Sequence, residues 1–194
     1  MNSLSEVFDD EKFQEKVQKK FSRLMEIADI EGLKIGNTGM EKGSIRKKYL
    51  INFLIDHFGK DRVKKINLLG IDVKIDSQPV KIKTISSKRG VKIKWTVDSN
   101  KVENFFSAYT PSFGILLVRL NWGMKAKNRP SGLFWIPIEA QKRVLKQMGL
   151  KTYLKPPKIG TNSRGVELSK EALEKLLTDI ETKHIDINWQ RTSL

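Results

Sequence analysis

The chain has 194 residues, with 37 Lys and Arg against 22 Asp and Glu, which gives a formal net charge of +15. It contains no Cys, so disulfides and Cys-ligated zinc or iron–sulfur sites are excluded, and two His are too few for a His-rich metal site. The sequence shows neither a membrane-spanning apolar run nor a signal peptide at its start, so we expect a cytoplasmic protein. The positive charge gathers between Lys42 and Lys101 and indicates a polyanionic partner.

Two amphipathic helices are predicted in the first part of the chain. Apolar residues recur at helical spacing through residues 6–30, and Gly32 and Gly36 then interrupt the pattern. A second apolar stripe covers residues 43–58, and Gly59 follows it at a position typical of a helix C-cap.

A three-stranded meander with short connections follows these helices. We predict its strands at residues 68–75, 80–85 and 91–97, where apolar and polar residues alternate and turn-forming residues separate the runs. A short helix is predicted at 99–109, and Pro111 ends it.

Strands and helices continue to alternate in the last part of the chain. The apolar run 114–120 predicts a strand buried on both faces, and another strand is predicted at 133–138. A helix is predicted at 139–148, and a last helix begins at Ser169. The apolar face expected for that last helix consists of Leu173, Leu176, Leu177 and Ile180. These elements predict one α/β domain with a central mixed sheet flanked by helices.

Three residues on two neighbouring strands are candidates for phosphodiester chemistry. Hydrolysis of a phosphodiester needs an activated water and neutralisation of charge at the phosphate. One arrangement places an Asp on one strand and a carboxylate and a Lys two residues apart on the next, since residues i and i+2 share a face. Here Asp72 lies on the first strand, and Lys81 and Lys83 lie on the second.

This spacing, together with the preceding helix, resembles the PD-(D/E)XK nucleases over about residues 43–120. The segments Asn121-Trp122, Leu133 to Pro137 and Gly160 to Glu167 extend the resemblance to type II restriction endonucleases similar to ThaI. The resemblance implies a restriction-endonuclease-like core, a homodimer, Mg²⁺ and a short palindromic site in double-stranded DNA, with G·C-rich sites among the candidates. It also implies a restriction-modification context.

The resemblance assigns roles to individual residues. Asp72 becomes a metal ligand, Lys83 the catalytic Lys, and Glu41 a second metal ligand carried by the preceding helix. Within the single domain 1–194, we expect a helical extension at 1–38, a nuclease core at 40–138 and a helical, DNA-reading part at 139–194.

Lys81 departs from the family pattern, because the position two before the catalytic Lys is normally Glu, Asp or Gln. A Lys cannot bind Mg²⁺, and it adds a like charge beside Lys83. Three explanations stay open: Glu41 or Asp76 takes over the ligand role, the chain is a natural inactive copy, or an acid was replaced to make a toxic nuclease tolerable.

A second register of the same motif stays open beside the first. Asp72 and Lys74 form an acid-x-Lys unit with Asp61 upstream, and this register keeps the acid that the first one loses. A solvated hairpin with alternating Asp and Lys is the structural alternative to both.

Several basic and polar residues are candidates for DNA contacts. In a loop stiffened by Pro, Asn162 and Arg164 can reach base edges in the major groove. Met40, in a Gly-rich turn, is either a wedge between base steps or part of a helix entry. The candidates for phosphate contacts are Arg46, Lys47, Lys88, Arg89, Lys125, Lys127 and Arg129.

Two other functional classes remain alternatives. Lys81 favours a non-catalytic DNA-binding protein on the same scaffold, and the charge alone supports an RNA-binding or ribosome-associated protein. His57 and His184 are expected to have structural or surface roles.

Overall fold

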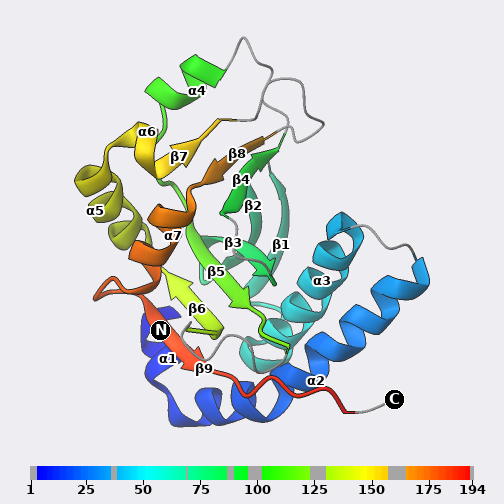
Figure 1. Cartoon of the computed structure of the whole chain (residues 1–194). Coiled ribbons are helices and arrows are strands. Elements are labelled where there is room, and N and C mark those ends of the chain that lie inside the picture. Colours follow the sequence, from blue (N-terminus) through cyan, green and yellow to red (C-terminus); the bar gives the residue numbers. More distant parts are fainter. Residues whose placement is uncertain are drawn as a thin grey trace.

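A computed structural model describes residues 4–35, 39–68, 70–86, 90–95, 102–122, 130–156 and 165–192. Figure 1 shows the arrangement of the elements. The helices are α1 (Leu4–Asp9), α2 (Glu11–Ile35), α3 (Gly39–Phe58), α4 (Val102–Ser107), α5 (Ile138–Met148), α6 (Leu150–Tyr153) and α7 (Lys170–Leu177). The strands are β1 (Val63–Leu68), β2 (Ile71–Ile75), β3 (Gln78–Ile85), β4 (Val91–Trp95), β5 (Gly114–Arg119), β6 (Gly132–Ile136), β7 (Leu154–Lys155), β8 (Gly165–Leu168) and β9 (Lys183–Asp186).

The central sheet is mixed, as the sequence predicted. Its six strands follow the order β1-β2-β3-β5-β6-β9, and β3 and β5 pair in parallel while the other neighbours are antiparallel. A second, antiparallel sheet has the order β4-β8-β7. No helix in the described ranges is both long and apolar enough to cross a membrane.

The meander prediction is confirmed for the strands at 68–75 and 80–85, which form β2 and β3, and is wrong for the strand at 91–97. The structure adds β1, which the sequence analysis did not predict, and β1, β2 and β3 form the meander. The run at 91–97 forms β4 instead, which leaves this sheet and pairs with β8. Alternation shows which side chains of a strand are buried, here Val91 and Ile93, but it does not show which sheet buries them.

The boundaries of the N-terminal helices also differ from the prediction. The first helix is divided at Asp10, whose side chain accepts a hydrogen bond of 2.8 Å from the amide of Phe13 and so caps α2. Helix α2 continues through Gly32, where a Cβ would lie 3.0 Å from Lys42 Cγ. Gly32 therefore permits the close approach of α3 to α2 and does not end the helix.

The C-terminal helices follow the sequence closely. Gly149, with φ 71°, ends α5, and the side chain of Ser169 accepts a hydrogen bond from the amide of Ala172 and caps α7. Ile180 was wrongly placed on the apolar face of this helix, because α7 ends at Leu177 and Ile180 is 91% exposed.

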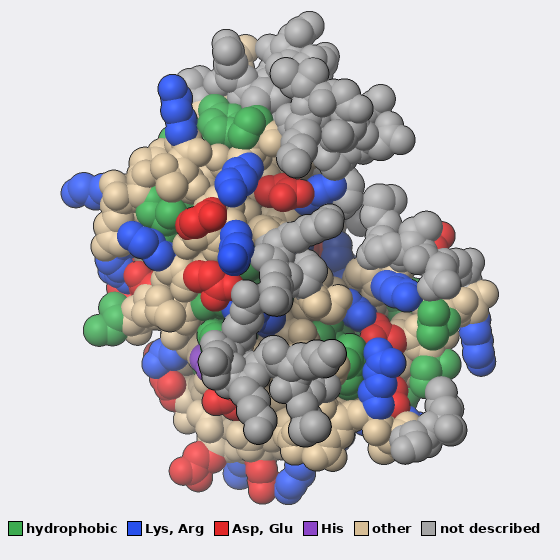
Figure 2. Space-filling view, in the orientation of Figure 1, with side chains coloured by type: hydrophobic (Ala, Val, Ile, Leu, Met, Phe, Trp, Pro, Cys, Tyr) green, Lys and Arg blue, Asp and Glu red, His purple; other side chains and the backbone are tan. Residues whose placement is uncertain are grey.

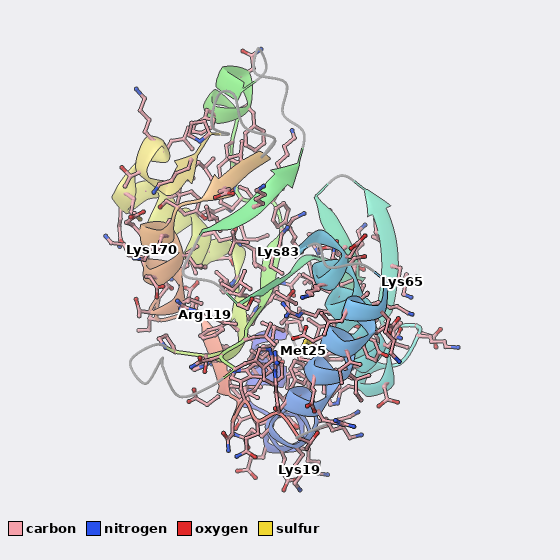
Figure 3. All side chains as sticks on the ribbon, turned by 45° about the vertical axis from the view of Figure 1, so that its right-hand side comes forward. Lys19, Met25, Lys65, Lys83, Arg119 and Lys170 are labelled. Atoms are coloured by element: carbon pink, nitrogen blue, oxygen red, sulfur yellow. The ribbon has the colours of Figure 1, made fainter. Side chains whose placement is uncertain are left out.

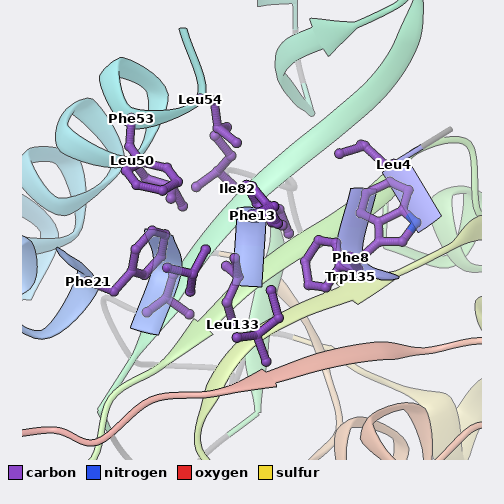
Figure 4. Packing of buried hydrophobic residues seen from close by; sticks show 14 of the residues in the cluster. Leu4, Phe8, Phe13, Phe21, Leu50, Phe53, Leu54, Ile82, Leu133 and Trp135 are labelled. Carbon is purple, nitrogen blue, oxygen red and sulfur yellow. The ribbon is translucent and has the colours of Figure 1, made fainter. Parts of the chain in front are cut away.

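Two apolar clusters lie on opposite faces of the central sheet. One packs α1, α2 and α3 on the sheet, and Figure 4 shows Phe21 beside Phe53 in this cluster, with Leu133 and Trp135 of β6 also part of it. The other lies between the central sheet, the small sheet, α5 and α7. The central strands β5 and β6 are therefore buried on both faces along their whole length.

Candidate active site

The candidate site lies where β2 and β3 separate. The last residues that pair before the separation are Val73 and Val80. Asp72 lies just beyond them, and its Oδ2 accepts a hydrogen bond of 2.8 Å from the amide of Ile82. The carboxylate thus bridges the two strands beside Lys81 and Lys83, so the structure assembles the three residues of the first register.

Helix α3 contributes a third lysine to this site. Lys47 Nζ donates a hydrogen bond of 2.6 Å to Asp72 Oδ1. The sequence suggested only a phosphate contact for Lys47. Its approach to Asp72 depends on the angle and position at which α3 crosses the sheet, and no local sequence pattern predicts that geometry.

Lys81 is buried, with 7% of its surface exposed. Its Nζ donates a hydrogen bond of 2.9 Å to the carbonyl oxygen of Gly70 and lies 5.5 Å from the centroid of the Phe113 ring. Burial is the main cause that lowers the pKa of Lys81, and nearby Asp72 opposes the shift. A carbonyl oxygen and the face of an aromatic ring both attract a cation. The ammonium group of Lys81 therefore has two favourable partners inside the protein.

Lys83 has the strongest perturbation in the site. Burial and then the positive charge of Lys81 lower the pKa of Lys83 to about 8, while Asp72 acts in the opposite direction. A lysine with this pKa exchanges its proton near neutral pH, which suits a general acid or base. Lys83 shares a face with Lys81, since Ile82 between them, like Val80 before them, is buried in the cluster on the opposite face.

The donor set around Asp72 does not fit a divalent cation. Both of its oxygens already accept hydrogen bonds, and the nearest charged neighbours are lysines. Within the described ranges, no group of three His, Asp or Glu side chains is placed to hold a metal. Glu41 lies in the first turn of α3, six residues before Lys47, at about 9 Å along the helix axis.

The other carboxylates considered from the sequence lie away from the site. Asp76 is in the turn between β2 and β3, where Arg62 donates two hydrogen bonds to it. Asp61 precedes β1, and the pairing of Val63 with Ile75 places it at that same distant end. The sheet register therefore does not assemble Asp61, Asp72 and Lys74.

The predicted DNA contacts are distributed over described and undescribed parts of the chain. Arg46 is buried, and its Nε donates a hydrogen bond of 2.5 Å to Asp29 Oδ1, so its guanidinium is engaged inside the protein. Met40 belongs to α3, but its side chain lies outside the described part of the structure. The same holds for Lys88, Arg89, Lys125, Lys127, Arg129, Asn162 and Arg164, which lie outside the described residues.

Both histidines pack against aromatic rings, in agreement with the structural roles expected for them. The ring of His57 lies 4.7 Å from that of Phe13, and burial lowers the pKa of His57. His184 stacks on Phe134 with ring centroids 4.0 Å apart.

Comparisons with known proteins agree on one class of enzyme. The family model described as "Restriction endonuclease ThaI" matches residues 7–194. A solved structure described as "Restriction endonuclease in complex with substrate DNA" is 38% identical, with a TM-score of 0.88. The similarity covers 100% of this chain and 93% of that one. No curated protein matches the sequence.

Proposed function

The chain belongs to the ThaI family of restriction endonucleases, and from this premise we propose that it binds double-stranded DNA and hydrolyses its phosphodiester bonds at Asp72, Lys81 and Lys83. The observation that carries the location is the position of Lys83, whose pKa is lowered to about 8 beside Asp72 at the separation of two strands. The relative at 38% identity is a restriction endonuclease with substrate DNA, which supports DNA as the substrate.

In the proposed mechanism, Lys83 handles the proton of the attacking water. The neutral amine accepts this proton as the water oxygen bonds to phosphorus and the bond to the leaving oxygen breaks. Lys47 places positive charge beside the phosphate, which stabilises the charge that develops on its oxygens, whereas Lys81 stands where the family has a metal-binding acid. Asp72 orients this group of lysines through its contact with Lys47.

Mg²⁺ is the cofactor implied by the family, but the residues around Asp72 do not fit it. We propose that Lys81 gives this chain weak Mg²⁺ affinity and slow cleavage while DNA binding is retained. Three lysines beside one carboxylate favour an anion such as phosphate and repel a divalent cation.

The decisive experiment compares the chain with Lys81→Glu in a paired plasmid digest with Mg²⁺. We expect Lys81→Glu to cut much faster, because it supplies a second carboxylate next to Asp72. Lys81→Met is the matched control, since it removes the positive charge without adding a ligand. Vigorous cutting by the unchanged chain, or no gain from Lys81→Glu, would place the metal site elsewhere.

A non-catalytic DNA-binding protein is the second candidate, and the same digest separates the two. Lys81 and the Lys47–Asp72 contact favour this candidate, because both put an ammonium group where a metal ligand or a metal is expected. Discrete fragments from either protein support the endonuclease. Duplex binding without fragments from both proteins supports the second candidate.

We also propose that the protein is a cytoplasmic homodimer. It would recognise a short palindromic site, with G·C-rich sites among the candidates. A two-fold symmetric protein matches a two-fold symmetric site. Analytical ultracentrifugation tests the dimer directly, and a monomer at the concentration that cuts DNA would contradict it.

In this proposal Asn162 and Arg164 read the bases, and Met40 inserts as a wedge between base steps. Phosphates are bound by the basic side chains of Lys47, Lys88, Arg89, Lys125, Lys127 and Arg129. Arg164→Ala is expected to relax base preference, because a bidentate Arg contact discriminates between bases. Lys47→Ala is expected to weaken binding to all sequences alike. Competition binding with duplexes of different sequence measures both effects, and equal losses for the two variants would contradict the division of roles.

A further inference from the structure

Two lysines lie directly opposite each other on the edge hairpin of the central sheet. Lys64 of β1 pairs in register with Lys74 of β2. Directly opposed residues of an antiparallel pair have Cβ atoms about 5 Å apart, and like charges at this separation destabilise the sheet. Neither lysine forms an ion pair with another residue in the part of the chain that the structure describes.

These lysines share a face with the candidate active site. On β2, Lys74 lies between Val73 and Ile75, which are buried in the cluster under α2 and α3. On β3, Lys81 and Lys83 alternate in the same way with buried residues of that cluster. Since alternate residues of a strand face opposite sides, all four lysines point to the sheet face away from α2 and α3.

The spacing of the strands extends this basic face outward from the site. With a rise of about 3.3 Å per residue and strands about 4.8 Å apart, Lys74 lies about 8 Å from Lys81 and Lys64 about 12 Å from it. A duplex carries one phosphate per about 3.4 Å of axis on each strand, so about 12 Å corresponds to three or four phosphates. β1 is the edge strand, and Lys64 is exposed.

We propose that Lys64 and Lys74 bind the phosphate backbone of duplex DNA that flanks the cut site. The inference rests on the proposed function, since it takes duplex DNA as the ligand of the adjacent site. Charge complementarity and continuity with the lysines around Asp72 identify this ligand. The repulsion between Lys64 and Lys74 in the free protein is relieved when phosphates lie between their ammonium groups.

Lys65 provides a matched control on the same strand. It has the same charge and is exposed, but it pairs with Val73 and therefore belongs to the opposite face. Figure 3 shows Lys65 at the outer margin of the molecule and Lys83 in its middle.

The experiment measures how duplex affinity depends on salt for Lys64→Ala, Lys74→Ala and Lys65→Ala, without Mg²⁺, on a duplex of about three helical turns. We expect the first two variants each to bind several-fold more weakly at low salt and to lose about 0.9 from the slope of log affinity against log salt. Lys65→Ala should keep the slope of the unchanged protein. Thermal unfolding checks the fold, and Lys64→Ala should melt no lower than the unchanged protein, because it removes a repulsion.

Two outcomes separate this inference from the proposed function. If the unchanged protein binds the duplex and all three variants have the same slope, the inference about Lys64 and Lys74 is wrong and the proposed function stands. If the unchanged protein does not bind duplex DNA at all, the proposed function itself fails.

Discussion

Lys83 shows how a single side chain couples chemistry to stability. Its lowered pKa means that the folded protein holds the charged form less readily than the unfolded chain does. Below about pH 8, Lys83 is protonated in both the folded and the unfolded protein, and it destabilises the fold. This destabilisation disappears as the pH rises from about 8 to 10.5, the ordinary pKa of a lysine. A residue kept at this cost to stability is typical of a functional site.

We therefore expect Lys83→Met to abolish cleavage and to raise the free energy of unfolding at pH 7 by about 1 to 3 kcal/mol. The unchanged protein should gain stability between pH 7 and pH 9 relative to Lys83→Met, because only the lysine titrates there. Urea unfolding at the two pH values measures this difference. Lys151→Met, at an exposed lysine of α6, is the control and should change neither quantity.

Cleavage by an active form of the protein should follow the same titration. If neutral Lys83 accepts the proton of the attacking water, the rate rises with pH and levels off once the pH exceeds the pKa of Lys83, which is about 8 in the unchanged chain. The measurement is a pH series of single-turnover rates with Lys81→Glu, which we expect to be the faster enzyme. Since the new carboxylate replaces one nearby positive charge, the midpoint should lie above the value for the unchanged chain. A rate that falls through this range would exclude Lys83 as the base.

At the scale of elements, glycines decide how closely neighbouring segments approach. Gly114 of β5 lies against Trp135 of β6, and a Cβ at this position would be 1.9 Å from Trp135 Cη2. Gly43 of α3, in contrast, has open space where a Cβ would lie. The same substitution should have opposite effects at the two positions.

Gly114→Ala is expected to lower the free energy of unfolding by about 3 kcal/mol, since a buried indole must move. Gly43→Ala should raise it by about 0.5 to 1 kcal/mol, because Ala is the better residue inside a helix. Urea denaturation of both variants tests this pair. Equal effects would show that the contact of β5 with β6 relaxes more easily than the structure indicates.

At the scale of the molecule, net charge alone does not locate the binding surface. On the face shown in Figure 2, Lys and Arg side chains lie among Asp and Glu side chains, and no single field of positive charge covers the described part of it. Many of the basic residues are also engaged in ion pairs, among them Arg46 with Asp29 and Arg119 with Glu174. The lysines around Asp72 and on the β1–β2 hairpin are therefore better indicators of the DNA path than the total of +15.

Duplex affinity should nevertheless fall steeply with salt. Each Lys or Arg that neutralises a phosphate contributes about 0.9 to the slope of log affinity against log salt, because it releases a bound counterion. A fluorescence titration between low and moderate salt measures the slope. A duplex affinity that does not change with salt concentration would contradict phosphate contacts of any kind. Stronger binding to RNA hairpins than to duplex DNA would favour the RNA-binding alternative.

The sequence by itself determined the features that depend on neighbouring residues. The doubly buried strand at β5, the caps at Gly149 and Ser169, and the spacing of Asp72, Lys81 and Lys83 all follow from local periodicity and turn chemistry. A strand places residues i and i+2 on one face whatever lies around it, so the two lysines could be assigned to one side before the fold was known.

Only the tertiary structure decided which of these elements meet. Three interactions join residues that are far apart in the chain: the pairing of β4 with β8, the contact of Lys47 with Asp72, and the hydrogen bond of Arg46 to Asp29. Such contacts depend on the crossing of helices over sheets and on strand order, which the local pattern leaves undetermined. The perturbed pKa of Lys83 has the same origin, because burial by distant segments lowers it and the residues beside it in sequence account for only part of the effect.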